Sequence, residues 1–368
     1  MMKVANPFYQ RISRVSLRND CIKIYEYEKK KVKSMLSNVS KISLTTDLWK
    51  SKNQKIGYMV VTGHFLDAEW KLNKWVLNFV HILPPHSGDN ISDALYKCLK
   101  DWGIENKIYT ISVDNASAND TANDTAIKNL REIFAMKKYL ICGGKLFHVR
   151  RCAHILNLIF QDGLSRIKSV IQDIRDSVSF LNQSEARVNT FCEVVQQLQV
   201  SGSKLILDCK TRWNSTYDML HCAYMFKDVF LIYQRKEPSY TSCPSKEGWE
   251  KVEKILDILV VFSNLTNIIS GSEYPTSNLF LVGVCKIKQS LDNRGSDESA
   301  FMKDMVDQMK KKFDKYWGEC NLLMSIAAVL DPRVKMRALD FCFPKIYRES
   351  EVDLNIEKVK RALLELYN

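Results

Sequence analysis

The sequence predicts an α+β fold in which a mixed sheet precedes a largely helical region. Residues 42–83 contain three short segments rich in β-branched and aromatic residues, separated by polar turns. An amphipathic helical pattern and a fourth apolar segment follow before residue 114. From about residue 154 onward, apolar residues recur mainly at helical spacing. These three observations place the sheet in the first half of the chain and the helices in the second.

Strands are expected over residues 42–47, 57–67 and 74–83, each rich in strand-forming residues. The third should end at Pro84 and Pro85, because proline cannot donate a hydrogen bond to a neighbouring strand.

Residues 1–39 form a basic segment, in which a helix is expected from about Asp20 to Leu36. Its lysines form either a solvated helix face or a set of contacts to DNA phosphates. The lysines in question are Lys29, Lys30, Lys31 and Lys33.

A helix after the third strand is the clearest local pattern in the sequence. Asn90 is expected to cap it and Gly103 to close it. Its apolar face comprises Ile91, Ala94, Leu95, Cys98, Leu99 and Trp102. A fourth strand over residues 109–113 then runs directly into Asp114.

Beyond Asp114 we expect a helix over 125–136 and a fifth strand over 145–150, before the helical region begins. Later helices are expected over residues 166–181, 186–199, 215–233, 247–270, 299–317 and 355–367.

Three consecutive strands, a helix and a fourth strand form the opening of an RNase H-like mixed sheet, although other α+β folds share this order. The sequence therefore divides into three parts. They are an N-terminal basic segment (1–39), a partial RNase H-like core (40–154) and an all-α domain (155–368).

Composition limits the classes of partner. The 368 residues carry a formal charge of +12, which favours nucleic acid as a partner. The 11 cysteines contain no CxxC pair, so we expect reduced thiols and no zinc site. The longest apolar run, Leu322 to Leu330, is too short to cross a bilayer, so no membrane partner is expected.

Two aspartates follow predicted strands and could carry chemistry. Asp47 stands at the end of the first strand and Asp114 at the end of the fourth. Neighbouring strands would bring both carboxylates to one end of the sheet, where they could hold Mg²⁺ for two-metal phosphodiester chemistry. The alternative is that each aspartate only stabilises a turn.

Several segments resemble the sequence blocks of hAT-superfamily (hobo/Ac/Tam3) transposases, in the correct order and over nearly the whole chain. Leu44-Thr45-Thr46-Asp47-Leu48-Trp49-Lys50-Ser51 and Ser112-Val113-Asp114-Asn115-Ala116-Ser117-Ala118-Asn119-Asp120 are similar to the two catalytic blocks. His148-Val149-Arg150-Arg151-Cys152-Ala153-His154-Ile155-Leu156-Asn157-Leu158 resembles the Cys/His block. Thr211-Arg212-Trp213-Asn214-Ser215-Thr216-Tyr217-Asp218-Met219-Leu220 resembles the tryptophan block. Tyr274-Pro275-Thr276, Phe313-Asp314-Lys315-Tyr316-Trp317 and Ala327-Ala328-Val329-Leu330-Asp331-Pro332-Arg333 resemble the plant, sleeper-like branch.

The resemblance implies roles for individual residues. Asp47 and Asp114 would be the first two metal ligands, ancestrally for Mg²⁺, and residues 155–368 would be the insertion domain of the nuclease core. Trp213, with Arg212 beside it, would stack on a DNA base near the cleavage site. The alternative for Trp213 is a buried core aromatic.

The chain departs from the family pattern in three respects. The third acid, a Glu after the insertion domain, has no matching block before Asn368; Glu319 and Glu365 lie in amphipathic patterns and are expected to be solvated. Arg151 occupies the usual cysteine position, so Cys152 and His154 are expected to pack in the core. The amino-terminal zinc finger and the dimerisation segment of full-length relatives also have no counterpart in these residues.

Three functions remain open on this basis. The first is a nuclear, transposase-derived DNA-binding protein without complete nuclease activity. The second is a metal-dependent transposase nuclease completed by missing sequence or by a partner. The third is a helical protein-interaction module that has lost DNA binding.

Overall fold

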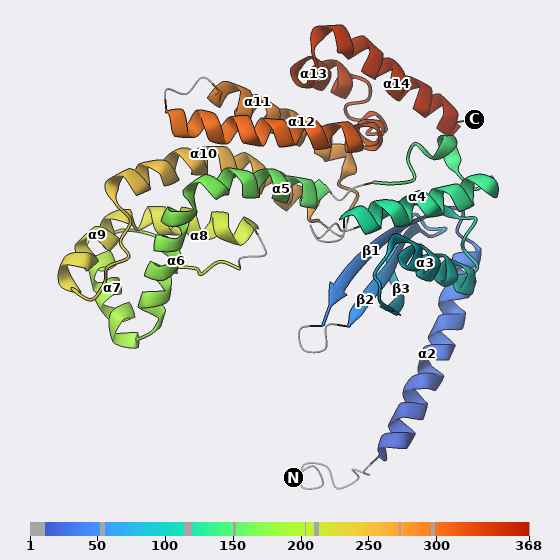
Figure 1. The fold of residues 1–368 in the computed structure, drawn as a ribbon, viewed down its shortest axis with the longest axis horizontal. Helices are drawn as coiled ribbons and strands as arrows, with labels where there is room; N and C mark the ends of the chain where they lie inside the picture. Colours follow the sequence, from blue (N-terminus) through green and yellow to red (C-terminus); the bar gives the residue numbers. More distant parts are fainter. Residues whose placement is uncertain are drawn as a thin grey trace. The chain divides into compact units, whose positions relative to one another are not determined.

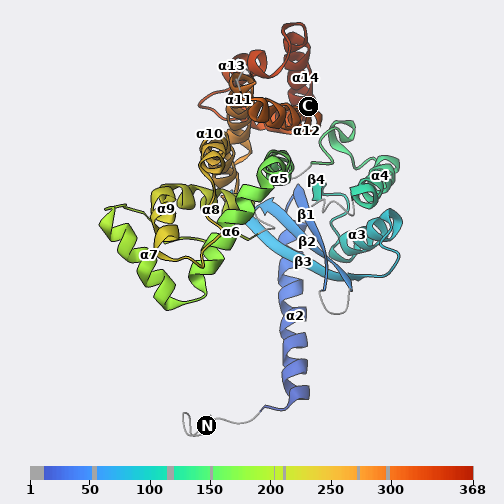
Figure 2. The same cartoon turned by 60° about the vertical axis from the view of Figure 1, so that its left-hand side comes forward.

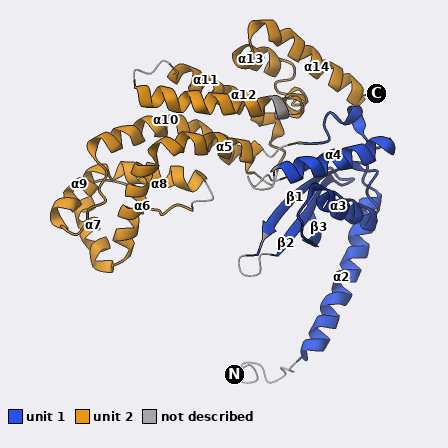
Figure 3. Ribbon diagram, in the orientation of Figure 1, with its two compact units in different colours: residues 1–148 blue, residues 149–368 orange. Residues whose placement is uncertain are grey.

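The computed structural model describes residues 12–51, 56–113, 120–149, 152–202, 204–209, 213–271, 274–295 and 299–367. The chain forms two compact units, Met1–His148 and Val149–Asn368, which Figure 3 shows in different colours. Each unit has its own secondary structure class, and each is described by itself.

Unit 1 contains a four-stranded mixed sheet (Figure 1). Its strands are β1 (Ile42–Lys50), β2 (Gly57–Leu66), β3 (Leu72–Ile82) and β4 (Ile108–Val113), in the spatial order β3-β2-β1-β4. β1 pairs antiparallel with β2, β2 antiparallel with β3, and β1 parallel with β4. The α+β class and the mixed RNase H-like sheet predicted from the sequence are therefore confirmed.

The prediction of a fifth strand over residues 145–150 is wrong. A short 3₁₀ helix, η1 (Ile141–Gly144), precedes it, and Gly143 and Gly144 turn the chain there with φ angles of 58° and 76°. The chain then runs beside β4 only briefly: the Phe147 carbonyl accepts a 2.6 Å bond from the Ile111 amide, and His148 forms one parallel bridge with Ile111. The described residues 145–147 form turns, so the extended strand predicted there is not present.

Helices α3 (Gly88–Trp102) and α4 (Asp120–Met136) lie on the same side of this sheet (Figure 2). The expected cap is corrected: Ser87, not Asn90, is the N-cap, and its hydroxyl oxygen accepts a 3.3 Å bond from the Asn90 amide. Gly103 ends α3 in the left-handed conformation, with φ 67°, as predicted.

Helix α2 (Arg14–Ser37) begins six residues before the predicted start, where the Ser13 hydroxyl caps the Ser16 amide. Val32 and Leu36 reach the core of unit 1. Lys29 donates a 2.7 Å hydrogen bond to Asp101 of α3, and this bond raises the pKa of the lysine. At least this lysine is therefore held within the fold by an ion pair.

Among the described residues of unit 2, all regular secondary structure is helical. The helices are α5 (Cys152–Leu164), η2 (Ser165–Ile167), α6 (Lys168–Asn182), α7 (Glu185–Gln197), α8 (Trp213–Met225), α9 (Lys227–Lys236), α10 (Lys246–Ile269), α11 (Ser277–Arg294), α12 (Ala300–Val329), α13 (Arg337–Ile346) and α14 (Glu349–Tyr367). No helix in the described part of the chain combines the length and apolar character that crossing a membrane requires.

Candidate functional site

Asp47 lies within β1 and not at its end, which corrects the sequence prediction. The hairpin with β2 continues past it to the pair Lys50↔Gly57, so β1 is three residues longer than expected. Asp47 is exposed and pairs with Val60, whereas its neighbour Thr46 is buried. Because successive side chains of a strand alternate between faces, the Asp47 carboxylate belongs to the sheet face opposite α3 and α4.

The two strands that carry the predicted metal ligands are parallel neighbours. Thr46 pairs with Val113, the last residue of β4. Asp114 follows Val113 in the sequence but lies outside the described residues, so its distance from Asp47 stays a prediction. The prediction started from these two strands being neighbours, and the structure shows that they are, in a parallel pairing.

The face that carries Asp47 also carries a cluster of aromatic rings, which sequence reasoning missed. Trp49 pairs with Tyr58 across β1 and β2, and their rings stack with centroids 5.1 Å apart. Phe79 of β3 stacks on Tyr58 at 5.0 Å. A signal was present in the sequence, because Asp47 and Trp49 are two positions apart in a strand and so share a face.

Further along the same face the surface becomes polar. Thr45 and His64 pair through a 2.9 Å hydrogen bond between the hydroxyl and ring Nε2. His64 in turn lies opposite Lys74 of β3. Among the residues of the four strands Asp47 is the only acid, and Lys74 of β3 is a basic residue on this face.

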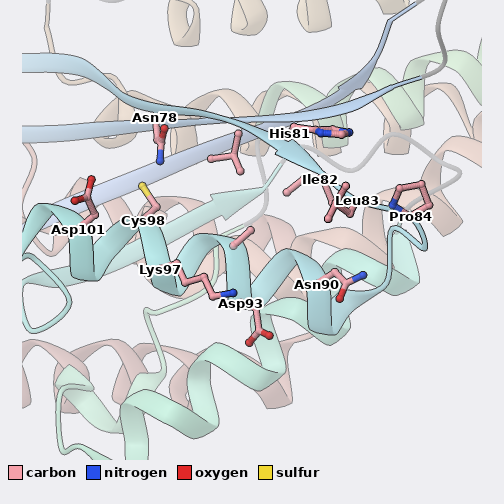
Figure 4. Close-up of a pocket in the computed structure, with 12 residues that line it drawn as sticks. Asn78, His81, Ile82, Leu83, Pro84, Asn90, Asp93, Lys97, Cys98 and Asp101 are labelled. Atoms are coloured by element: carbon pink, nitrogen blue, oxygen red, sulfur yellow. The ribbon is translucent and has the colours of Figure 1, made fainter. Parts of the chain in front are cut away.

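A cavity on the other side of the sheet of unit 1 is a different site. It holds about 600 Å³ between β3 and α3, and Figure 4 shows Asn78 and Ile82 of β3 facing Lys97, Cys98 and Asp101 of α3. Burial raises the pKa of the Cys98 thiol to about 11, so the thiol stays protonated at neutral pH and is not a nucleophile. The cavity lies on the α3 side of the sheet and contains none of the predicted site residues.

Trp213 is the first residue of α8 in unit 2, and it is only 5% exposed. Its ring centroid lies 4.2 Å from that of Phe160 in α5. Arg212, the other predicted DNA contact, lies outside the described residues. The burial of the indole favours the core-aromatic alternative over a base-stacking role.

A buried ion pair fixes the segment that leads to α8. Asp208, whose side chain is 1% exposed, accepts 2.9 and 2.6 Å bonds from the Arg175 guanidinium of α6. It also accepts a 2.7 Å bond from the Thr216 hydroxyl of α8. Nothing in the sequence spacing suggested the ion pair, because Arg175 and Asp208 are 33 residues apart along the chain.

Asp331, in the block Leu330-Asp331-Pro332-Arg333, holds a turn between α12 and α13. Its carboxylate accepts bonds from the Arg333 guanidinium, the Arg333 amide and the Asn278 side chain of α11. These bonds, with the guanidinium first, lower the pKa of Asp331 well below its usual range. The residue therefore serves the packing of α11 through α13.

The remaining candidates do not add a ligand to a described site. Cys152 and His154 are half-buried near the start of α5, and Glu365 is exposed on α14. The side chain of Glu319 is not among those described. Within the described part of the chain, no three His, Cys, Asp or Glu side chains are grouped so that they could hold a metal ion.

The fold and the position of Asp47 together define a chain with an RNase H-like sheet followed by a helical region. Family models agree: residues 45–146 match the ZBED1 RNase-like domain and residues 149–258 match the ZBED1 RNase-like helical domain. Residues 278–368, which form α11 to α14, match the model described as hAT-like transposase, RNase-H fold.

Similar proteins are found among plant transposases and sleeper proteins. The zinc finger BED domain-containing protein RICESLEEPER 2 of Oryza sativa subsp. japonica is 35% identical over 363 residues, which cover 98% of this chain and 50% of that protein. The putative AC transposase of Zea mays is 34% identical over 370 residues, covering 100% of this chain and 45% of the relative. DAYSLEEPER of Arabidopsis thaliana is 32% identical over 363 residues, with coverage of 98% and 51%.

The chain belongs to the hAT superfamily of transposases and transposase-derived proteins, in its sleeper-like branch. It spans about half the length of these curated relatives. The resemblance seen in the sequence blocks is thereby confirmed.

Proposed function

We propose that this chain is a hAT transposase-derived nuclear protein that associates with DNA and lacks complete nuclease activity. The observation that supports this proposal most directly is the similarity to sleeper proteins across 98% of the chain. The charge of +12 supports DNA as the partner, because Lys and Arg side chains neutralise phosphates.

Asp47 and Asp114 are the residues proposed to hold a metal. The exposed carboxylate of Asp47 provides the hard oxygen ligands that Mg²⁺ prefers, and the parallel pairing of β1 with β4 supports a second carboxylate nearby. A bound pair of metal ions would supply activation of water and stabilisation of the leaving oxygen. Among the described residues no third carboxylate is grouped with Asp47, and two carboxylates alone hold such a pair weakly, so we propose that the chain does not cut DNA.

A nicking assay tests this proposal. The 368-residue chain is incubated with supercoiled plasmid and Mg²⁺ or Mn²⁺, beside Asp47→Asn and Asp114→Asn variants. We expect no nicking above the level of the two variants. Metal-dependent nicking that both substitutions abolish would contradict the loss of activity and identify a nuclease whose remaining ligand lies within the chain.

A complete transposase nuclease is the second candidate, because the putative AC transposase matches the whole chain at 34% identity. In this case the missing ligand comes from further sequence or from a partner. Adding a nuclear extract to the purified chain should then produce nicking that depends on Asp47, whereas the first proposal expects none.

Nuclear localisation is tested directly. A fluorescent fusion of the chain is expressed in plant cells, with the fluorophore alone as control. We expect the fusion to concentrate in the nucleus and to remain there after mild detergent extraction, because DNA holds it. Release by the same extraction would instead support the helical protein-interaction module.

A further inference from the structure

The aromatic cluster beside Asp47 forms a continuous layer of rings on one face of the sheet. Trp49, Tyr58 and Phe79 come from three adjacent strands, and Trp49 also lies 5.9 Å from Phe79 between ring centroids. His81 extends the layer, with its ring 5.8 Å from that of Tyr58. We call these four residues the aromatic layer.

Trp49, Phe79 and His81 are exposed to solvent and Tyr58 is half-buried, although the apolar area of the rings would favour burial. Trp49 is 46% exposed and Phe79 53% exposed. The core of unit 1 forms on the other face, where α3 and α4 contribute Leu95, Leu99 and Leu130. Exposed rings that cluster in this way mark a surface that binds something.

The position of the layer relates it to the proposed metal ligand. Asp47, Val60 and Phe79 occupy one cross-strand row of the sheet, and Trp49, Tyr58 and His81 occupy the next. Adjacent rows on one face are only two residues apart along a strand, which is about 7 Å. A ligand stacked on the rings would therefore lie directly beside the Asp47 carboxylate.

Basic and polar groups lie at one end of the sheet face that carries the layer. Apart from Asp47 the four strands contain no acid, and the polar end of the same face presents Lys74, His64 and the Thr45 hydroxyl. Stacked rings with nearby cations and hydroxyls match the chemistry of an unpaired nucleic-acid strand, whose bases stack on aromatics while its phosphates contact basic groups.

We propose that the aromatic layer binds unpaired DNA bases and holds a single strand across the sheet beside Asp47. The inference rests on the proposed DNA association and gives it a surface in unit 1. It also assigns base stacking to exposed rings in place of Trp213, whose indole is buried.

The test measures the affinity of the full chain for a fluorescein-labelled dT20 oligonucleotide and for a 20-base-pair duplex. Phe79→Leu and Trp49→Leu keep apolar bulk but remove a ring, whereas Phe79→Tyr and Trp49→Phe keep a ring at each position. We expect each leucine variant to weaken dT20 binding by about 10-fold, since stacking contributes that order of affinity for each base. Duplex binding should change by less than about 2-fold, because paired bases expose no face to the rings.

Trp70→Leu is the matched control, because Trp70 is 82% exposed in the turn between β2 and β3 and lies outside the layer. It should leave dT20 affinity unchanged, and the two ring-keeping variants should restore most of the affinity. Circular dichroism and thermal unfolding establish that the leucine variants fold.

The outcomes separate this inference from the proposed function. Duplex binding without dT20 binding, or equal losses on both substrates in the leucine variants, would overturn the inference and leave DNA association intact. A wild-type chain that binds neither substrate overturns both. If the leucine variants bind DNA normally but lose a protein partner, the layer is a protein-docking surface and the inference is wrong.

Discussion

The indole of Trp213 is held in the packing between α5 and α8. It is 5% exposed and close to Phe160, so its removal would leave a cavity that neighbouring helices fill only in part. We expect Trp213→Ala to lower the free energy of unfolding by about 3–5 kcal/mol, with Trp213→Phe losing clearly less. Urea denaturation followed by circular dichroism measures both.

A different result would restore the role that the family resemblance suggests. If Trp213→Ala unfolds at the wild-type urea concentration yet loses affinity for hairpin DNA, the indole must leave the core to stack on a base. The wild-type structure gives no support for that movement.

The contribution of Asp331 to the free energy of unfolding depends on pH, and its hydrogen-bond partners determine the direction of that dependence. Arg333 and Asn278 lower the pKa of the folded carboxyl below its usual 3.8, so the unfolded chain takes up the proton first. The stabilisation is therefore complete above about pH 5 and is lost as the pH falls below about 4. We expect the difference in unfolding free energy between wild type and Asp331→Asn to narrow over that acid range.

Chemical denaturation between about pH 2.5 and pH 7 tests this expectation. Arg333→Gln is the control, because it removes the largest cause of the shift and should flatten the same acid dependence. A difference between wild type and Asp331→Asn that stays constant throughout would show that the Arg333 contact does not stabilise the folded state.

At the scale of elements, the sheet could be predicted closely from the sequence, whereas several helices could not. Strand formers bounded by turns locate β2 and β4 to within a residue or two. β1 extends beyond its prediction because the hairpin with β2 adds ladder bonds that local propensity does not include. Pairing between strands is a tertiary effect, and the position of Asp47 within its strand depended on it.

Two helices, α11 and α13, were not predicted, and tertiary contacts are again the reason. α11 (Ser277–Arg294) begins after Thr276, which makes no side-chain cap bond, so no local capping contact stabilises its start. α13 contains Pro344, which sequence rules treat as a helix breaker. Both helices bury apolar faces against their neighbours, including Phe280 and Phe343, so packing decides their formation.

The structure and the sequence prediction differ on the N-cap of α3, which is Ser87 in the structure and Asn90 in the prediction, and an experiment can decide between them. Ser87 accepts the bond from the Asn90 amide, and that amide is retained when the Asn90 side chain changes. We expect Ser87→Ala to cost about 1 kcal/mol of unfolding free energy. Asn90→Ala should cost less, because its exposed side-chain bond to the Pro85 carbonyl is weak in water.

Thermal unfolding of the two variants beside wild type makes the comparison. If Asn90→Ala proves the more destabilising, the helix begins at Asn90, as the sequence analysis expected. Ser87 would then be an ordinary loop residue.

At the scale of the whole molecule, the family assignment came from short sequence blocks, while the candidate site needed three-dimensional pairing. The blocks single out Asp47 and Asp114 as candidate metal ligands without any geometry, and the relatives confirm the family. The aromatic layer could not be assembled from the sequence alone, because Tyr58 and Phe79 join Trp49 only through the register of β2 and β3. Similarly, Trp213 is buried because it packs on α5, and the tryptophan block of the sequence does not indicate this burial.

The net charge of +12 belongs to the chain as a whole and predicts how duplex DNA binding depends on salt. Each phosphate that a lysine or arginine neutralises releases condensed counterions, so the logarithm of affinity should fall by about 0.9 per contact for each unit of log salt. We expect a steep, linear fall in anisotropy titrations between about 50 and 200 mM KCl, and nearly equal affinity for duplexes of unrelated sequence. The sequence contains no CxxC pair, so it gives no sign of a zinc finger that would read base edges. Nanomolar binding to one duplex sequence at physiological salt, with little salt dependence, would therefore contradict an electrostatic mode of binding and require a base-reading surface within these residues.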